Sequence, residues 1–269
     1  MLNISKQITD LEDQYDFSIC TLVTRENEYS EMIESFVEKG FTKDRCEYLH
    51  INNSSGKGLD AYKGLNLFLQ TAKGKYIIIC HQDILLLEHG YEHLTQKISE
   101  INLLDENWGI LANAGGLNYK WVAVNITTGK GRVFKEAELP LKCSTIDENF
   151  FIVKKSANIA LSNNLKGFHM YGTDICLIAD ILGYSSYVID FHLLHKSDGN
   201  ADAVFYQNKK QLIDKYNHAF RSRYMATTCT KLFISGSSAT YWFFNSKLVK
   251  FFVRKYNKFF KKRDKYYLS

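Results

Sequence analysis

Short apolar runs alternate with amphipathic segments over the first 112 residues of the chain. These stretches, rich in apolar residues, are 17–23, 46–51 (interrupted by Glu47 and His50), 76–80 and 108–112. The segments between them carry apolar side chains at helical spacing and span residues 27–39, 60–72 and 91–104. Short apolar runs bounded by turn residues predict buried strands. The resulting order of strand, helix, strand, helix, strand, helix and strand predicts a parallel, doubly wound α/β sheet with right-handed crossovers.

Polar side chains follow three of these predicted strands at the point where each strand ends. They are Thr24–Asn27, Asn52–Ser54 and His81–Asp83. In doubly wound sheets, ligands bind beyond the carboxyl ends of the strands, so the three segments should meet in one crevice. Asp83 interrupts the apolar stretch KYIIICHQDILLL. It either caps the following element or supplies a hard oxygen ligand for Mg²⁺ or Mn²⁺ at a pyrophosphate.

The glycine patterns that cradle nucleotide phosphates are missing. Gly56 and Gly58 form a G-x-G, but no third glycine follows at the spacing of a dinucleotide fingerprint, and no P-loop motif occurs. A nucleotide bound here would therefore be held by side chains and a metal ion.

The region after residue 112 is less regular. Thr173 is predicted to cap a helix over Asp174–Leu182, and Tyr187–Asp190 is predicted to be a strand that leads to His192 and His195. An acid in a first helical turn stabilises the helix dipole, but Asp174 could equally be a general base facing the crevice, with His169 beside it. The two histidines are either structural or ligands of a metal or phosphate.

Composition excludes several other classes of protein. The six cysteines occur singly, without a C-x-x-C pair, so a zinc framework is not expected. We expect the thiols to be reduced and buried. The polar N-terminal segment lacks the pattern of a signal peptide, and no apolar stretch reaches the roughly 18 residues of a membrane span.

The basic charge of the chain is concentrated at its C-terminus. Residues 241–269 contain nine Lys/Arg and one acid, a net +8, which leaves −3 on the rest because the whole chain carries +5. Aromatic and basic residues interleave, and a basic amphipathic helix is predicted over residues 247–262. This pattern fits a membrane surface better than nucleic acid. The alternative is a helix that packs on its own domain or on another subunit.

Five segments of the sequence together resemble one enzyme family. They are LNLFLQTAKGKYIIICHQDILL, WGILANAGG, CSTIDENFFIVKKS, GFHMYGTDICLIADILGYSSYVI and LLHKSDGN. In order and spacing they resemble the family 2 glycosyltransferases of GT-A fold, in the branch whose metal motif reads His-Gln-Asp in place of Asp-x-Asp. The resemblance covers residues 17–200. It implies a Rossmann-like, mostly parallel central sheet flanked by helices over residues 1–220, and it leaves residues 221–269 as a helical, basic-aromatic extension.

The resemblance also implies roles for individual residues. Asp174 is expected to be the catalytic base. The donor and metal site is expected to consist of Thr21, Arg25, Asn52, His81, Gln82 and Asp83, with Asp83 and His195 as metal ligands. The acceptor is expected to contact Asp147, Glu148 and His169. Asn52 departs from the family, which has an aspartate there to read the base, although an amide oxygen can still accept the hydrogen bond.

The function implied by the resemblance is that of an inverting, metal-dependent, hexosyltransferase-type enzyme. A sugar would pass from a nucleotide diphosphate sugar, with a UDP-sugar favoured, to a glycan acceptor, expected to be lipid-linked, in surface polysaccharide synthesis. Mn²⁺ or Mg²⁺ would be the cofactor. The enzyme would be cytoplasmic and peripheral at the inner face of the cell membrane; it would bind no nucleic acid and could oligomerise. The alternatives are a non-catalytic nucleotide-sugar or glycan-binding module on the same fold and a sugar nucleotidyltransferase.

Overall fold

The computed structural model describes residues 13–261, except 56–57, 137, 198 and 200. Two expectations depend in part on residues outside this range. The expectation about a signal peptide concerns the N-terminal segment, and the expectation of a basic-aromatic tail includes the last residues of the chain. The chain divides into two compact units, Met1–Lys209 and Lys210–Ser269. The division falls inside helix α5 (Ala203–Ala219), whereas the predicted boundary lies at residues 220 and 221.

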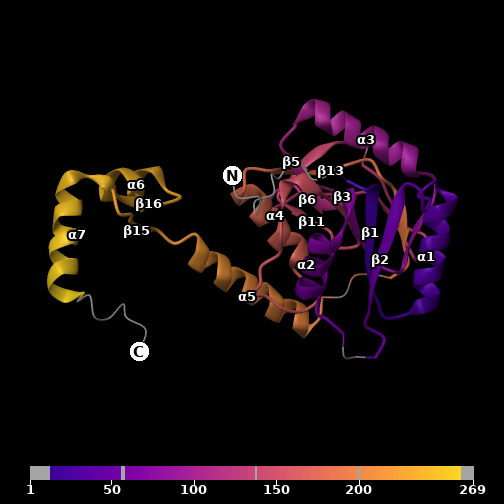
Figure 1. The fold of residues 1–269 in the computed structure, drawn as a ribbon, viewed down its shortest axis with the longest axis horizontal. Coiled ribbons are helices and arrows are strands. Elements are labelled where there is room, and N and C mark those ends of the chain that lie inside the picture. Colours follow the sequence, from indigo (N-terminus) through magenta and orange to yellow (C-terminus); the bar gives the residue numbers. More distant parts are fainter. Residues whose placement is uncertain (1–12, 56–57, 137, 198, 200, 262–269) are drawn as a thin grey trace, which may run out of the picture. The chain divides into compact units, whose positions relative to one another are not determined.

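Unit 1 is built on a seven-stranded sheet with the order β10-β13-β5-β12-β3-β1-β2 (Figure 1). Its strands are β1 (Tyr15–Val23), β2 (Cys46–Asn52), β3 (Gly74–Cys80), β5 (Trp108–Ala112), β10 (Leu141–Cys143), β12 (Phe150–Lys154) and β13 (Ser185–Val188). Strands β1, β2, β3, β5 and β13 run in one direction, and β10 and β12 run in the other. The predicted α/β class with a mostly parallel central sheet flanked by helices is therefore confirmed. Within this sheet, β12 lies antiparallel between β3 and β5.

Helices cover both faces of this sheet. The helices of unit 1 are α1 (Glu26–Glu38), α2 (Ala61–Thr71), α3 (Tyr91–Leu104) and α4 (Tyr171–Ile181), with a short 3₁₀ turn η1 (Lys155–Ala157). The buried side chains of α1 and α3 join one core cluster with alternate strand residues such as Phe17, Ile78 and Trp108. Helix α2 packs on the opposite face, where Gly64 closely approaches Leu22. The period-2 alternation of strand side chains thus separates the two helix layers.

The start of α4 differs from the prediction. The helix begins at Tyr171, after Met170 at φ 69°, and the N–H of Asp174 already donates to the carbonyl of Met170. Thr173 is therefore inside the first turn and is not the cap. Asp60, by contrast, does cap α2, because its side chain accepts from the N–H of Lys63.

Two small sheets extend the carboxyl edge of the main sheet. One contains β11 (Thr145–Ile146), β6 (Ala114–Gly116) and β7 (Val122–Val124), in that order. The other contains β4 (Ile84–Leu86), β14 (Leu193–His195), β8 (Ile126–Thr128) and β9 (Val133–Phe134). Because β4 follows β3 directly, its pairing with β14 brings the end of β14 to the edge of the main sheet.

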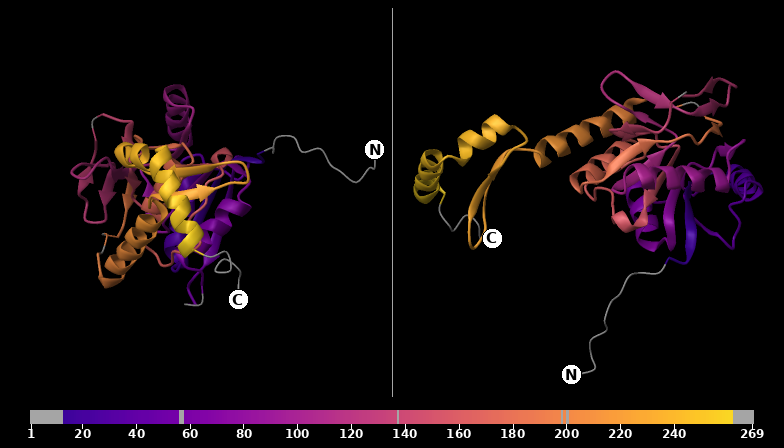
Figure 2. Two further views of the ribbon diagram at one scale, coloured as in Figure 1. Left: turned by 90° about the vertical axis from the view of Figure 1, so that its left-hand side faces the viewer. Right: turned by 90° about the horizontal axis from the view of Figure 1, so that it is seen from above.

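Unit 2 consists of a hairpin and two short helices after the second half of α5 (Figure 2, orange to yellow). The hairpin is β15 (Arg223–Ala226) with β16 (Lys231–Ile234), and the helices are α6 (Ser238–Asn245) and α7 (Lys247–Phe260). The predicted helix over residues 247–262 corresponds to α7, whereas the hairpin and α6 were not predicted. Over the described part of the chain, none of the helices combines the length and the apolar character that crossing a bilayer requires.

All six cysteines are free. Five are buried, and burial raises the pKa of the Cys46, Cys80 and Cys176 thiols to about 12. Cys229, in the turn between β15 and β16, is exposed. The expectation of unpaired thiols is therefore confirmed, although not every one is buried.

Candidate active site

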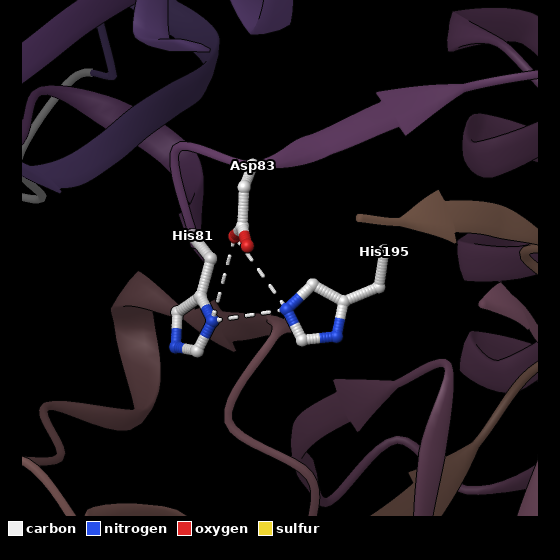
Figure 3. Close-up of side chains that lie close together, drawn as sticks. All are labelled: His81, Asp83 and His195. Atoms are coloured by element: carbon white, nitrogen blue, oxygen red, sulfur yellow. Dashed lines mark hydrogen bonds and ion pairs between the residues drawn. The ribbon is translucent and has the colours of Figure 1, made fainter. Parts of the chain in front are cut away.

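The His-Gln-Asp segment lies between β3 and β4, at the carboxyl edge of the main sheet. Ile84 of β4 is paired with His195 of β14, so the strand pairing places His195 beside Asp83. The N–H of Lys196 donates to the carbonyl of Asp83 and fixes this contact. Figure 3 shows that the side chains of His81, Asp83 and His195 point toward one another. Two strands that are distant in the sequence thus assemble one three-residue cluster.

The geometry of this cluster fits a divalent cation. Nε2 of His195 lies 3.5 Å from Oδ1 of Asp83. Nδ1 of His81 lies 4.0 Å from the same oxygen and 3.4 Å from Nε2 of His195. A point in the plane of these three atoms lies about 2.1 Å from each of them, which is an ordinary metal–ligand distance. The predicted ligands Asp83 and His195 therefore do meet, and His81, which was not predicted to be a metal ligand, joins them.

Tyr171 orients the ring of His81. Its hydroxyl lies 3.0 Å from Nε2 of His81 and 3.4 Å from the carbonyl of Glu148. When the hydroxyl donates to that carbonyl, it accepts from Nε2–H of His81, and Nδ1 then presents its lone pair to Asp83 and His195. A neighbour that fixes the tautomer in this way is typical of histidines that bind metals.

The protonation states also suit a cation. Burial disfavours the charged form of Asp83, but hydrogen bonds from His195 and Ser197 and the charges of both histidines outweigh it, so the pKa of Asp83 is lowered. Burial, followed by the neighbouring His195, lowers the pKa of His81. An ionised carboxylate and a neutral imidazole are the forms in which these side chains bind metals.

A cavity of about 270 Å³ opens beside the cluster. Its lining comes from the ends of β1, β2 and β3 and from the segment before α4, and it includes Leu22, Thr24, Arg25, Asn53, His81, Asp83, Phe168, Tyr171 and Ser197. The three polar strand ends thus meet in one crevice, as the sequence predicted.

Two predicted donor contacts do not line this cavity. Thr21 is buried on the other face of β1, where its hydroxyl lies 3.5 Å from the thiol of Cys80; the next residue, Leu22, faces the cavity. Asn52 is exposed and uses its carboxamide on Ser54 and Glu26, whereas Asn53 lines the cavity. Both corrections are shifts of one residue, which reverse the direction of a strand side chain. Counting the alternation from Phe17 and Ile19, which are core residues, would have found Leu22.

Gln82 holds a loop in place. Its Oε1 accepts from the N–H groups of Thr24, at 2.7 Å, and Arg25, at 3.0 Å, and its Nε2 donates to Thr24 and Glu28. Gln82 thus positions the turn after β1; it also lines the cavity, so its predicted donor contact stays a prediction. Arg25 lines the cavity and pairs with Glu28 at 2.8 Å, so its predicted donor contact stays a prediction.

Asp174 does not face the crevice. Its side chain is fully buried, and its two oxygens accept from the N–H and the hydroxyl of Ser162 at 2.8 and 2.5 Å. The early start of α4 turns this position inward. The expectation that the side chain of Asp174 faces the crevice is therefore wrong, because the carboxylate binds Ser162, while its role as catalytic base stays a prediction.

Glu148 contacts the N-terminus of α4. Its Oε1 accepts from the N–H of Gly172 at 2.9 Å. A Cβ at position 172 would lie 3.1 Å from Cγ of Glu148, so glycine leaves the room that this carboxylate occupies. Burial, with a contribution from Asp147, raises the pKa of Glu148 to about 8. The site therefore has a carboxyl group that exchanges protons near neutral pH.

The antiparallel strand β12 explains how residues 147–149 reach the site. Phe150 pairs with Cys80, and the N–H of His81 donates to the carbonyl of Asn149 at 2.9 Å. Asp147, exposed, and Glu148 therefore lie beside the carboxyl end of β3. Their predicted contact with an acceptor stays a prediction.

The remaining predicted histidines have different surroundings. His169 contacts the ring of Phe205 and accepts a hydrogen bond from Tyr62 at its carbonyl, so its acceptor role stays a prediction. Both ring nitrogens of His192 are in hydrogen-bond contact, with Asn125 and Thr127. The structural alternative therefore holds for His192.

Comparison with known structures defines the class of fold. No known protein-family model matches the sequence. The structure of Staphylococcus aureus TarS, residues 1–349, in complex with UDP-GlcNAc matches with a TM-score of 0.51 over 91% of this chain and 73% of that chain, at 12% identity. The chain thus has the GT-A type of α/β fold that the sequence predicted.

Comparison with known sequences shows the family. The protein named "ATP synthase subunits region ORF 6" from Fuscovulum blasticum is 31% identical over 226 residues, which are 82% of this chain and 91% of that protein. The chain belongs to the family of this protein. The name of the relative states no activity, so the evidence for a function comes from the site.

Proposed function

We propose that the protein is an inverting glycosyltransferase that moves a sugar from a nucleotide diphosphate sugar to a hydroxyl of a glycan acceptor. The observation that carries this proposal is the joining of His81, Asp83 and His195 beside a cavity at the carboxyl edge of a GT-A sheet. The TarS structure of the same fold contains UDP-GlcNAc, which supports a UDP-sugar as the donor.

The proposed cation is Mn²⁺. Mg²⁺ prefers an almost complete oxygen shell, whereas two imidazoles and one carboxylate suit a transition metal better. A cation held by Asp83, His195 and His81 would neutralise the diphosphate as charge develops on the leaving group. Tyr171 would keep His81 in the tautomer that this binding requires.

The proposed donor subsite is the cavity beside the cluster. Leu22 and Leu65 give it an apolar wall, and Thr24, Arg25 and Asn53 place polar groups at its rim. Gln82 holds the N–H groups of Thr24 and Arg25, so the rim is positioned before a donor arrives. Such preorganisation lowers the cost of binding.

We assign the role of general base to Glu148 in place of Asp174. A base that works near neutral pH needs a pKa close to that pH. Glu148 meets this condition with a pKa of about 8, and Tyr171 connects its backbone to His81. In the proposed step, the acceptor hydroxyl attacks the anomeric carbon, its proton passes to the ionised carboxylate of Glu148, and the bond to the nucleotide diphosphate breaks on the opposite face.

The proposed acceptor is lipid-linked, in surface polysaccharide synthesis, and the proposed location is the cytoplasmic face of the cell membrane. Asp147 and His169 are the proposed acceptor contacts. A non-catalytic module would bind donor without releasing nucleotide, and a nucleotidyltransferase would release pyrophosphate from a nucleoside triphosphate and a sugar phosphate. Product analysis therefore separates the three functions.

The test measures UDP release from UDP-GlcNAc and other UDP-sugars in the presence of Mn²⁺, with water as acceptor. We expect slow release by the native protein and a loss of roughly 10²–10⁴-fold in Glu148→Gln, because general-base assistance is worth about that much. Asp174→Asn is the matched control. It should keep its turnover within about tenfold while losing roughly 1–3 kcal/mol of unfolding free energy, since it disturbs buried hydrogen bonds to Ser162.

Two outcomes would overturn these assignments. Binding of UDP-sugars without any UDP release would make the chain a binding module. Near-normal release by a folded Glu148→Gln variant, together with its loss in a folded Asp174→Asn variant, would return the base to Asp174.

A further inference from the structure

Unit 2 contains almost no core of its own. Over the described residues from 210 to 261, the buried side chains are those of Leu212, Tyr216 and Phe233. Many large apolar side chains in this range are exposed, namely Ile213, Phe220, Met225, Ile234, Tyr241, Trp242, Phe243, Leu248, Phe251, Phe252, Tyr256, Phe259 and Phe260. A folded segment that exposes this much apolar surface is typical of a binding surface.

Helix α7 separates its apolar and basic side chains onto two faces. Ser246 caps the helix by accepting from the N–H of Val249. At the helical period, one face carries Leu248, Val249, Phe252, Val253, Tyr256, Phe259 and Phe260, and the other carries Lys247, Lys250, Arg254, Asn257 and Lys258. Phe251 and Lys255 lie at one boundary between the two faces. Leu248, Phe252 and Phe259 are 68%, 61% and 65% exposed. The apolar face of α7 is thus largely open to solvent.

The charged residues of this C-terminal region are basic. Residues 215–263 contain twelve Lys/Arg and no Asp or Glu. Five of the basic residues belong to α7 itself. The first turn of α6 also lacks acids, and the exposed rings of Trp242 and Phe243 lie in that helix. An apolar face next to a purely basic one is complementary to a surface that offers both hydrocarbon and negative charge.

We propose that α7 and the exposed rings of α6 bind the surface of an anionic lipid bilayer. The helix would lie in the interface plane, with its apolar face between the lipid chains and its basic residues at the headgroups. Phosphates of nucleic acid would satisfy the basic residues but would leave Leu248, Phe252 and Phe259 in water. A second copy of the chain would bring two basic helices together without acidic partners. The anionic bilayer alone matches both faces.

The test is co-flotation of the full chain with vesicles of phosphatidylcholine alone or with 30% phosphatidylglycerol. We expect binding to the anionic vesicles that falls steeply when the salt concentration rises, because the electrostatic part is screened. A triple variant, Leu248→Ser, Phe252→Ser and Phe259→Ser, should reduce partitioning at least tenfold. Lys250→Gln with Lys258→Gln should weaken binding less, and only at low salt.

A matched control lies in unit 1. Leu103 of α3 is 91% exposed, so Leu103→Ser removes an equally accessible apolar side chain from another helix and should leave vesicle binding unchanged. Because all three apolar substitutions are at exposed positions of unit 2, UDP release in vesicle-free buffer should also be unchanged. Failure of membrane binding and failure of the proposed transfer reaction are therefore distinguishable.

Three results would overturn the proposal. One is the absence of flotation with anionic vesicles. Another is equal flotation of the native protein and the triple variant. The last is that the native protein sediments as a dimer and the triple variant as a monomer, with no change in vesicle binding. This result would assign the apolar face to a second copy of the chain.

Discussion

Unit 1 contains two clusters of the same composition, each with two histidines and one aspartate. His81, Asp83 and His195 form the first, and His89, His93 and Asp190 form the second. In both, the side-chain nitrogens and oxygens lie within 4.8 Å of one another. Their surroundings differ: the first lies beside the cavity at the end of β3, where Tyr171 orients the ring of His81. Asp190 of the second cluster lines a different cavity, together with Lys97, Lys135 and Glu136.

In the second cluster, one ring nitrogen of each histidine is hydrogen-bonded to the backbone. Nδ1 of His89 accepts from the N–H of His192 at 2.9 Å, so in the neutral ring Nε2 carries the proton. Nε2 of His93 lies 2.6 Å from the carbonyl of Asp190, to which it donates. The two rings stack at 3.7 Å. Because composition and proximity are the same in both clusters, we expect the cation in the first cluster on the basis of the orientation of its ring nitrogens.

The largest expected effect separates the two aspartates. Asp83→Ala should reduce UDP release at least about 100-fold, because it removes the charged ligand that would hold the cation at the diphosphate. Asp190→Ala should leave release within about threefold. Equal losses in two folded variants would show that the second cluster also serves the reaction and would break the comparison.

A smaller effect is expected from single histidines. His195→Ala should weaken Mn²⁺ binding at least about tenfold, since one of three protein ligands is lost, whereas His93→Ala should leave it unchanged. Titration of Mn²⁺ followed by electron paramagnetic resonance measures both variants. Weaker binding in His93→Ala alone would place the cation in the second cluster.

The smallest effect concerns pH. Burial, followed by neighbouring positive charge, lowers the pKa of His89 and of His192 below the ordinary value of 6.5. The unfolded chain therefore binds protons before the folded protein does, and the unfolding free energy should fall as the pH drops from 7 through 6.5 toward the folded pKa values. His89→Gln should flatten this decrease in urea titrations between pH 8 and pH 5. If the unfolding free energy of the variant had the same slope against pH as that of the native protein, His89 would not be a source of the pH dependence.

The strands and helices of the first half of the fold were predictable because each has its own pattern of apolar residues in the sequence. Each strand before residue 112 carries a short stretch rich in apolar residues, and each helix between these strands has its own apolar face. The placement of β12 between β3 and β5 depends on pairing across distant segments, which no local pattern records. Its consequence, residues 147–149 beside His81, was accessible only through the resemblance.

The site was predictable in its main carboxylate and not in its details. Asp83 stood out because it breaks an apolar stretch, but the contact with His195 depends on the pairing of β4 with β14. The surroundings of Asp174 were not predictable from local patterns: α4 starts at Tyr171 and not after Thr173, Asp174 is bound to Ser162, and Glu148 contacts the N–H of Gly172.

The arrangement of the cysteines makes a built-in reporter available. A thiol reacts as its thiolate, and burial with a raised pKa suppresses that form in the interior. A maleimide dye should therefore attach selectively at Cys229, in the hairpin turn of unit 2, without any engineered residue. Quenching of that dye by brominated lipids would report how close the turn comes to a bilayer.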